Sequence, residues 1–169
     1  MSIRKLAVSL SASAVVIGAL SMGGGVTAPA FAGVACNLIT GTSAGETLQG
    51  TSGNDCIYGY GGNDIIKGAG GNDLIYGGTG ADSINAGKGD DTVYGENGAD
   101  TINGGFGADT LGGGADADTI NDGNGVDTLN GGRGSDTLNS VQGNRQHDTL
   151  NGDGGHNVCN ADPSDTVNC

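Results

Sequence analysis

The sequence has no tryptophan, two phenylalanines and four tyrosines, whereas glycine occurs 37 times in 169 residues. Few aromatic residues and many charged and flexible ones are typical of chains that bury too little apolar surface to fold. Composition alone therefore favours disorder. The regular order in which the residues recur argues the other way.

Basic residues are also scarce, with 6 Lys and Arg against 19 Asp and Glu. All the acids lie after residue 45, and from residue 33 onward only four strong bases remain, so that part has a formal net charge of −15. Nucleic-acid binding needs basic contacts to phosphate, so we expect no nucleic-acid partner. The charge balance suits cations, although a solubilising acidic surface is the simpler alternative.

The first 32 residues have the layout of a secretory signal peptide. Arg4 and Lys5 form a basic start, an apolar run extends to Leu20, and Ala30-Phe31-Ala32 fits a small-residue cleavage site. The apolar run is too short and too rich in Ser and Gly to span a bilayer comfortably. We expect cleavage after Ala32, no membrane insertion, and secretion of one extracellular domain, residues 33–169.

The four cysteines include no Cys-x-x-Cys pair, which disfavours a zinc site. An even number of cysteines in an exported chain predicts disulfides. Three pairings are possible. Proximity in sequence favours Cys36–Cys56 and Cys159–Cys169, each closing a short loop at one end of the domain.

Catalytic motifs are missing as well. The sequence has neither the HExxH pattern of zinc proteases nor the GxSxG pattern of serine hydrolases, and His147 and His156 lie outside the regular part of the chain. We therefore expect no enzymatic activity.

What the chain does contain is a nine-residue repeat. An aliphatic residue stands two positions after each repeated acid, and glycine stands two positions before nearly every one. Glu46 has the same phase one step earlier. The repeated acids are Asp55, Asp64, Asp73, Asp82, Asp91, Asp100, Asp109, Asp118, Asp127 and Asp136. Three kinds of residue, acid, aliphatic and glycine, that recur with the same period are a strong signal of a repeat fold.

The unit reads GGxGxDxUx, where U is aliphatic, with clean copies beginning at Gly77, Gly104 and Gly131. Over about residues 41–160 the sequence resembles the hemolysin-type (RTX) calcium-binding repeat family, and also small stand-alone secreted calcium-binding proteins. The resemblance implies a parallel β-roll. In it, six-residue turns bind Ca²⁺ and three-residue strands build two facing sheets.

The residues independently favour an all-β fold, a parallel β-roll (β-solenoid) of 18-residue coils with disulfide-tied ends. One apolar position in nine cannot form the stripe of an amphipathic helix, and frequent glycine weakens helices. In an x-U-x strand, U points inward. Two repeats make one coil, and coils stack about 4.8 Å apart. We expect regular repeats over about residues 41–139 and a degenerate C-terminal cap over 140–169.

In such a stack alternate aspartates form two columns, one beginning at Asp55 and one at Asp64. Carboxylates about 4.8 Å apart repel by about 3 kcal/mol at an effective dielectric constant of 20. A cation must therefore lie between them, and hard carboxylate and carbonyl oxygens select Ca²⁺. Solvated turn residues, the alternative, need no shared period. By the resemblance, each ion is held by carboxylates and carbonyls of two turns one coil apart.

We predict that the ten repeated aspartates and Asp148 bind Ca²⁺, at roughly eight sites between turns. Ala86, Asp122 and Asp116 replace consensus glycines before Asp91, Asp127 and Asp118. After Leu138 the phase breaks, because the next acid, Asp148, stands twelve residues after Asp136. This indicates a turn lengthened by three residues.

The outward positions carry a second pattern. Tyr58, Tyr76 and Tyr94 are 18 residues apart and should stack on one sheet, while threonines and asparagines form rows on the other. Like residues pair well on adjacent strands, which explains such rows without a function. Our leading hypothesis is a secreted, non-enzymatic calcium-binding protein that folds on binding its ions. The alternative is an extracellular adhesive protein whose Tyr or Thr/Asn face binds polysaccharide or ice.

Overall fold

The computed structural model describes residues 36–140 and 146–169. The predicted signal peptide and its cleavage site lie outside these ranges. All regular elements in the described ranges are β-strands, and this part of the chain offers no helix that could serve as a membrane span.

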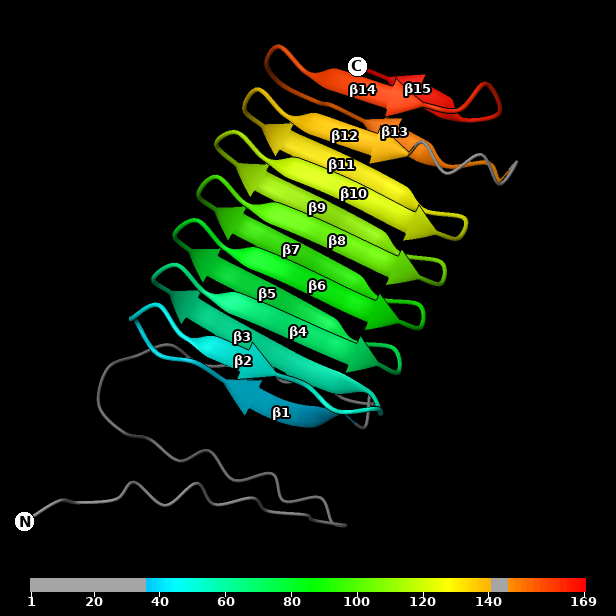
Figure 1. Cartoon of the computed structure of the whole chain (residues 1–169). Coiled ribbons are helices and arrows are strands. Elements are labelled where there is room, and N and C mark those ends of the chain that lie inside the picture. Colours follow the sequence, from blue (N-terminus) through cyan, green and yellow to red (C-terminus); the bar gives the residue numbers. More distant parts are fainter. Residues whose placement is uncertain (1–35, 141–145) are drawn as a thin grey trace, which may run out of the picture. The chain divides into compact units, whose positions relative to one another are not determined.

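The strands alternate between two parallel sheets that stack coil upon coil (Figure 1). One sheet consists, in spatial order, of β1 (Asn37–Thr40), β3 (Asp55–Gly61), β5 (Leu74–Thr79), β7 (Thr92–Asn97), β9 (Thr110–Ala115), β11 (Thr128–Arg133), β13 (Thr149–Asn151) and β15 (Thr166–Asn168). The other consists of β2 (Thr47–Gln49), β4 (Ile65–Gly70), β6 (Ser83–Lys88), β8 (Thr101–Phe106), β10 (Thr119–Asn124), β12 (Thr137–Ser140) and β14 (Val158–Ala161). The parallel β-roll expected from the repeat is confirmed.

The register between strands confirms the 18-residue coil. Ile57 pairs with Ile75 in one sheet, and Ile84 pairs with Ile102 in the other. Between β11 and β13 the separation grows to 21, as Thr128 pairs with Thr149. This coil therefore contains the three extra residues expected from the break in phase.

The strands are longer than expected. Each strand from β4 to β11 has six residues, so the three-residue strands and six-residue turns implied by the resemblance are wrong. Beyond the x-U-x segment, the second glycine and the residue after it pair again with the next coil, as Gly87 does with Gly105. Gly87 has a φ of +119°, a value that L side chains rarely adopt, so the chain bends there without leaving the sheet.

The core is a double row of aliphatic side chains between the two sheets. Successive residues of a strand point to opposite faces, so the U residues turn inward while their neighbours face out. The buried cluster comprises Leu48, Ile57, Ile66, Ile75, Ile84, Ala86, Val93, Ile102, Leu111, Ile120, Leu129, Leu138 and Leu150. Cys159 packs against this cluster in the U position of β14.

Both favoured disulfides are present. Cys36 is bonded to Cys56 and ties the chain ahead of β1 to β3. Cys159 is bonded to Cys169 and ties β14 to the last residue of the chain. Each bond therefore holds a terminal coil, where neighbouring strands are present on one side only.

Candidate metal centre

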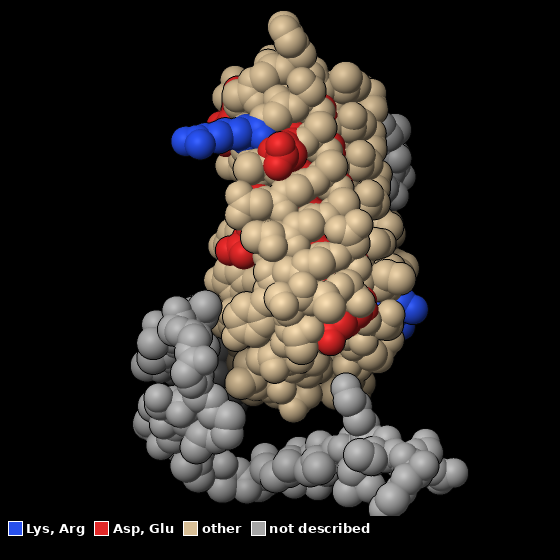
Figure 2. Space-filling view, turned by 90° about the vertical axis from the view of Figure 1, so that its left-hand side faces the viewer, with Lys and Arg blue, Asp and Glu red and all other residues tan. Residues whose placement is uncertain are grey.

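The eleven predicted aspartates are buried, with at most 3% of each residue exposed. Each stands immediately ahead of a strand or, for Asp55, at its first residue. On the face shown in Figure 2, acidic atoms appear only as small separate patches. The negative charge that the composition suggested for the surface is therefore concentrated along the inner edges of the roll.

The structure brings these aspartates together in the two expected columns. The backbone N–H of every one except Asp136 donates to Oδ1 of the aspartate one coil later, at 2.7 Å from Asp73 to Asp91 and at 3.0 Å from Asp118 to Asp136. One column contains Asp55, Asp73, Asp91, Asp109, Asp127 and Asp148. The other contains Asp64, Asp82, Asp100, Asp118 and Asp136.

The columns continue beyond the predicted residues. The N–H of Glu46 donates to Asp64 Oδ1 at 2.7 Å, so Glu46 begins one column, and Asn157 ends it by accepting from the N–H of Asp136. Asp165 extends the other column, because its Oδ1 accepts from the N–H of Asp148 at 3.1 Å. Sequence reasoning missed Asp165. Its signal is the Asp-Thr-Val triplet at 165–167, which matches Asp-Thr-Leu at 148–150.

The second carboxylate oxygen, Oδ2, is the unusual feature of the columns. Two aspartates of the Asp55 column have a satisfied Oδ2: Asp55 Oδ2 accepts from the Thr51 N–H at 2.6 Å, and Asp148 Oδ2 accepts from Ser140 Oγ at 2.8 Å. For nine of the eleven aspartates, Oδ2 is buried with no hydrogen-bond partner among the described residues: Asp64, Asp73, Asp82, Asp91, Asp100, Asp109, Asp118, Asp127 and Asp136. Buried polar atoms are normally paired, so these oxygens call for a ligand.

Seven of these nine oxygens face a gap beside the glycine five residues earlier, which a side chain would fill. A Cβ on Gly77 would lie 2.6 Å from Asp82 Oδ2 and 2.8 Å from the carbonyl oxygen of Gly95, which is one coil further. The same pair of oxygens, from the aspartate five residues on and the carbonyl 18 residues on, surrounds this point at Gly50, Gly59, Gly68, Gly95 and Gly104. Carboxylate and carbonyl oxygens from two coils are the donor set that Ca²⁺ prefers.

A family model of the RTX calcium-binding nonapeptide repeat matches the chain in four copies, over residues 40–75, 76–111, 107–138 and 139–165. The chain belongs to this RTX family. Its repeats and its roll imply a calcium-binding protein. A search of curated proteins finds no match.

Burial changes the acidity of the RTX aspartates. Removal from water, the largest cause, raises the pKa of Asp73 to about 6 and those of Asp91 and Asp100 to about 7. The N–H of the preceding aspartate acts in the opposite direction, while neighbouring carboxylates add to the rise. Without a cation, the charged form is disfavoured in the folded roll.

The departures from the RTX consensus at Asp116, Ala86 and Asp122 have different places in the structure. Asp116 adopts a φ of +80°, as its consensus glycine position requires, and short polar side chains tolerate this conformation better than most. Ala86 and Asp122 stand where other repeats have the glycine beside the gap, and both are fully buried. At Ala86 a methyl group therefore occupies the place that is open in other turns.

Proposed function

We propose that the protein is secreted and non-enzymatic, and that its roll folds when Ca²⁺ binds between turns of successive coils. The observation that carries the proposal is the row of nine buried Oδ2 atoms without hydrogen-bond partners among the described residues. Each would hold a cation together with a backbone carbonyl of the next coil. With the cation absent, the single aliphatic residue of each repeat must offset a buried carboxylate, which is costly.

Folding and binding are then coupled, because the two sides of each gap come together only when the coils stack. Where Ca²⁺ is scarce, the acidic chain repels itself and stays extended; outside the cell the ion is abundant and the roll closes. The two disulfides support an extracellular location, since such bonds persist in oxidising compartments.

A calcium titration followed by circular dichroism tests this proposal. The purified chain from Gly33 should lack β-structure in EGTA and gain it in millimolar Ca²⁺, while Mg²⁺ at the same concentration should have little effect, because it dehydrates reluctantly. Calorimetry then gives the number of ions. An identical spectrum in EGTA and in Ca²⁺ would contradict coupled folding. The N-terminal sequence of the exported protein, expected to begin at Gly33, tests secretion separately.

Adhesion to a surface is the second candidate, and the stacked tyrosines favour it. The rings of Tyr58 and Tyr76 lie 5.2 Å apart, and those of Tyr76 and Tyr94 lie 5.1 Å apart. This regular row on one sheet could bind a polysaccharide. Joint substitution of the three tyrosines by serine should abolish polysaccharide binding and leave the number of bound Ca²⁺ ions unchanged. Unaltered binding by the triple variant would exclude the tyrosine face.

A further inference from the structure

The tyrosine row ends abruptly at Gly112. Along the outer face of the sheet, Tyr58 pairs with Tyr76 and Tyr76 with Tyr94, but the next partner of Tyr94 is Gly112, followed by Asn130. One position of the row therefore has no side chain. This vacant position lies between the ring of Tyr94 and the amide of Asn130.

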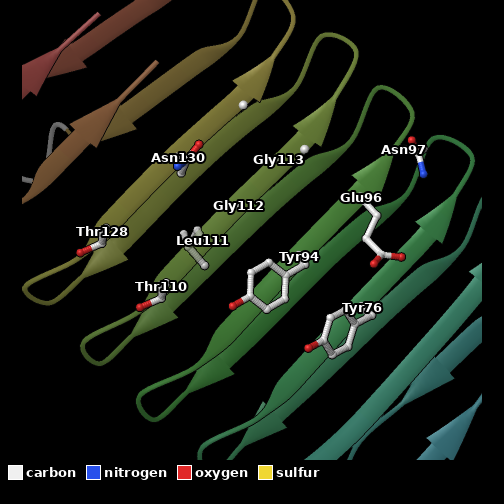
Figure 3. Close-up of a pocket in the computed structure, with 12 residues that line it drawn as sticks. Tyr76, Tyr94, Glu96, Asn97, Thr110, Leu111, Gly112, Gly113, Thr128 and Asn130 are labelled. Atoms are coloured by element: carbon white, nitrogen blue, oxygen red, sulfur yellow. The ribbon is translucent and has the colours of Figure 1, made fainter. Parts of the chain in front are cut away.

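The last ring of the row is exposed toward this vacant position. Tyr58, covered by its neighbours, is 8% exposed, whereas Tyr94 is 39% exposed. A Cβ on Gly112 would lie 3.4 Å from Cδ1 of Tyr94, so the ring stands directly beside the missing side chain. Figure 3 shows Tyr76 and Tyr94 side by side on adjacent strands, with Gly112 on the strand that follows.

A hollow of about 630 Å³ opens at this point. Its wall is apolar beside Tyr94, and polar groups surround that wall: the hydroxyls of Thr110 and Thr128, the amide of Asn130 and the carboxylate of Glu96. Among the described residues that line the hollow, Glu96 is the only charged one. The hollow has the size of a small-molecule site and combines one ring platform with a few polar groups that fix orientation.

We propose that this hollow binds a sugar ring with a protonated amine, such as one glucosamine unit of a polysaccharide. The C–H groups on one face of the sugar would stack on the Tyr94 ring, as the next rung of the row. The amine would be attracted both by the ring face and by Glu96. Hydroxyls of the sugar would bond to Thr110 and Asn130. An acidic sugar would be repelled by Glu96, and an N-acetylated one would lose the charge interaction.

The inference rests on the proposed calcium-dependent roll, because the hollow is lined by four successive strands, β5, β7, β9 and β11, and exists only when their coils are stacked. It names a ligand for the adhesive candidate and confines binding to one end of the tyrosine row. Glucosamine is preferred to a plain hydroxylated ring because of the single, unbalanced carboxylate in the wall.

The test is calorimetric titration of the calcium-loaded protein with a short glucosamine oligomer at moderate salt, with N-acetylglucosamine and uronic-acid oligomers as comparisons. Three variants address the hollow. Gly112→Tyr completes the row and fills the space, at a residue whose added Cβ meets only ordinary contacts. Tyr94→Ala removes the platform. Glu96→Gln removes the charge and keeps the size of the side chain.

Asp90→Asn is the matched control for the loss of charge. Asp90 is exposed, does not line the hollow, and its Oδ1 accepts the N–H of Ala108 at 2.9 Å. Asparagine already serves in this role one coil earlier, where Asn72 accepts the N–H of Asp90. The variant should therefore fold normally and bind the sugar as the wild type does.

We expect glucosamine binding that is lost in Gly112→Tyr and Tyr94→Ala, falls about tenfold in Glu96→Gln, and is unchanged in Asp90→Asn. All variants should retain the calcium-induced circular-dichroism change. Binding that persists in Gly112→Tyr, or an equal loss in Asp90→Asn and Glu96→Gln, would overturn the inference. A wild type that folds with Ca²⁺ but binds no glucosamine refutes this inference alone, whereas one that never responds to Ca²⁺ refutes the proposed function. A wild type that binds no sugar but forms a dimer, which Gly112→Tyr abolishes, would show that the hollow mediates self-association. That result would also count against the inference.

Discussion

The N–H of Asp73 donates to Oδ1 of Asp91 at 2.7 Å, and Oδ2 of Asp91 is left buried without a hydrogen-bond partner among the described residues. One oxygen of the carboxylate thus joins the two coils, while the other needs a cation. Repeated along both edges of the roll, this arrangement makes the stability of the fold depend on what neutralises Oδ2. A proton and a calcium ion are the two candidates, and they compete.

The stability of the folded roll should therefore depend on pH in opposite directions without and with calcium. The pKa of Asp91 and that of Asp127 rise from an ordinary 3.8 to about 7, and that of Asp73 to about 6. The folded state then binds more protons than the unfolded chain, so stability in EGTA is full at low pH and lost as pH rises through 6 to 7. Circular dichroism in EGTA should show more β-structure at about pH 5.5 than at about pH 7.5, where the chain without calcium is unfolded.

With excess Ca²⁺ the trend should change sign, because protons displace the ion from the carboxylates. The calcium affinity measured by calorimetry should fall as pH is lowered toward 5.5. Equal β-structure at the two pH values in EGTA would show that the buried carboxylates do not control stability.

Asp100→Asn should have opposite effects with and without calcium. The amide oxygen can still accept the N–H of Asp82, now at 2.8 Å from Asp100 Oδ1, but the charge on the unpartnered oxygen is gone. In EGTA the folded roll should gain roughly 1–3 kcal/mol relative to the unfolded chain, since a buried unsatisfied charge is removed, and β-structure should persist to a higher pH than in the wild type. In saturating Ca²⁺ it should bind fewer ions and melt at a lower temperature. Asp153→Asn, at an exposed position, should leave the β-structure in EGTA and the melting temperature in Ca²⁺ nearly unchanged.

A methyl group beside Oδ2 should weaken calcium binding. Gly77→Ala places a Cβ 2.6 Å from Asp82 Oδ2 and 2.8 Å from the carbonyl of Gly95, where both oxygens would face the ion. We expect about one ion fewer per chain, or one site weakened at least tenfold. The reverse change, Ala86→Gly, opens the equivalent gap beside Asp91 and should strengthen one site. Calorimetric titration of both variants checks the pair, and an unchanged profile for Gly77→Ala would place the ions elsewhere.

Ala69→Gly should stabilise the calcium-loaded roll. Ala69 has a φ of +84° at the position where Gly87, in the next coil, has a φ of +119°. A left-handed backbone costs a residue with a Cβ about 1–2 kcal/mol, so glycine should raise the free energy of unfolding by about 1 kcal/mol. Ala81→Gly is the control, because Ala81 is an exposed turn residue without this strain and glycine there should slightly lower stability. Urea unfolding in saturating Ca²⁺ measures both, and a destabilised Ala69→Gly would contradict the explanation.

The period of nine predicts most of this fold because one interval sets several features at once. It places Ile57 and Ile75 on adjacent strands of one sheet, puts Asp73 next to Asp91, and aligns Tyr58 with Tyr76. Strand length was harder to predict. The glycine segment of each repeat reads as turn, yet it pairs with the identical segment of the next coil, and that pairing exists only in the stack.

The terminal coils follow the period least, because each lacks a neighbour on one side. Asp165 was missed for this reason: it stands 17 residues after Asp148 and follows an irregular coil, so neither the period nor the glycines mark it. Ser140 was likewise unremarkable in sequence. In the structure it satisfies Oδ2 of Asp148 and lies 3.1 Å from Oδ2 of Asp165.

The sequence by itself determined the repeat, the coil, the inward aliphatic rows and the two aspartate columns, because side-chain identity carries these features and a fixed period propagates them. Only the tertiary structure decided which oxygen of each carboxylate accepts an N–H, which backbone carbonyl faces the other oxygen, and where the tyrosine row leaves a hollow. Those features depend on backbone atoms and on the distance between stacked coils. Backbone carbonyls are the same in every residue, so no sequence pattern reveals where they converge.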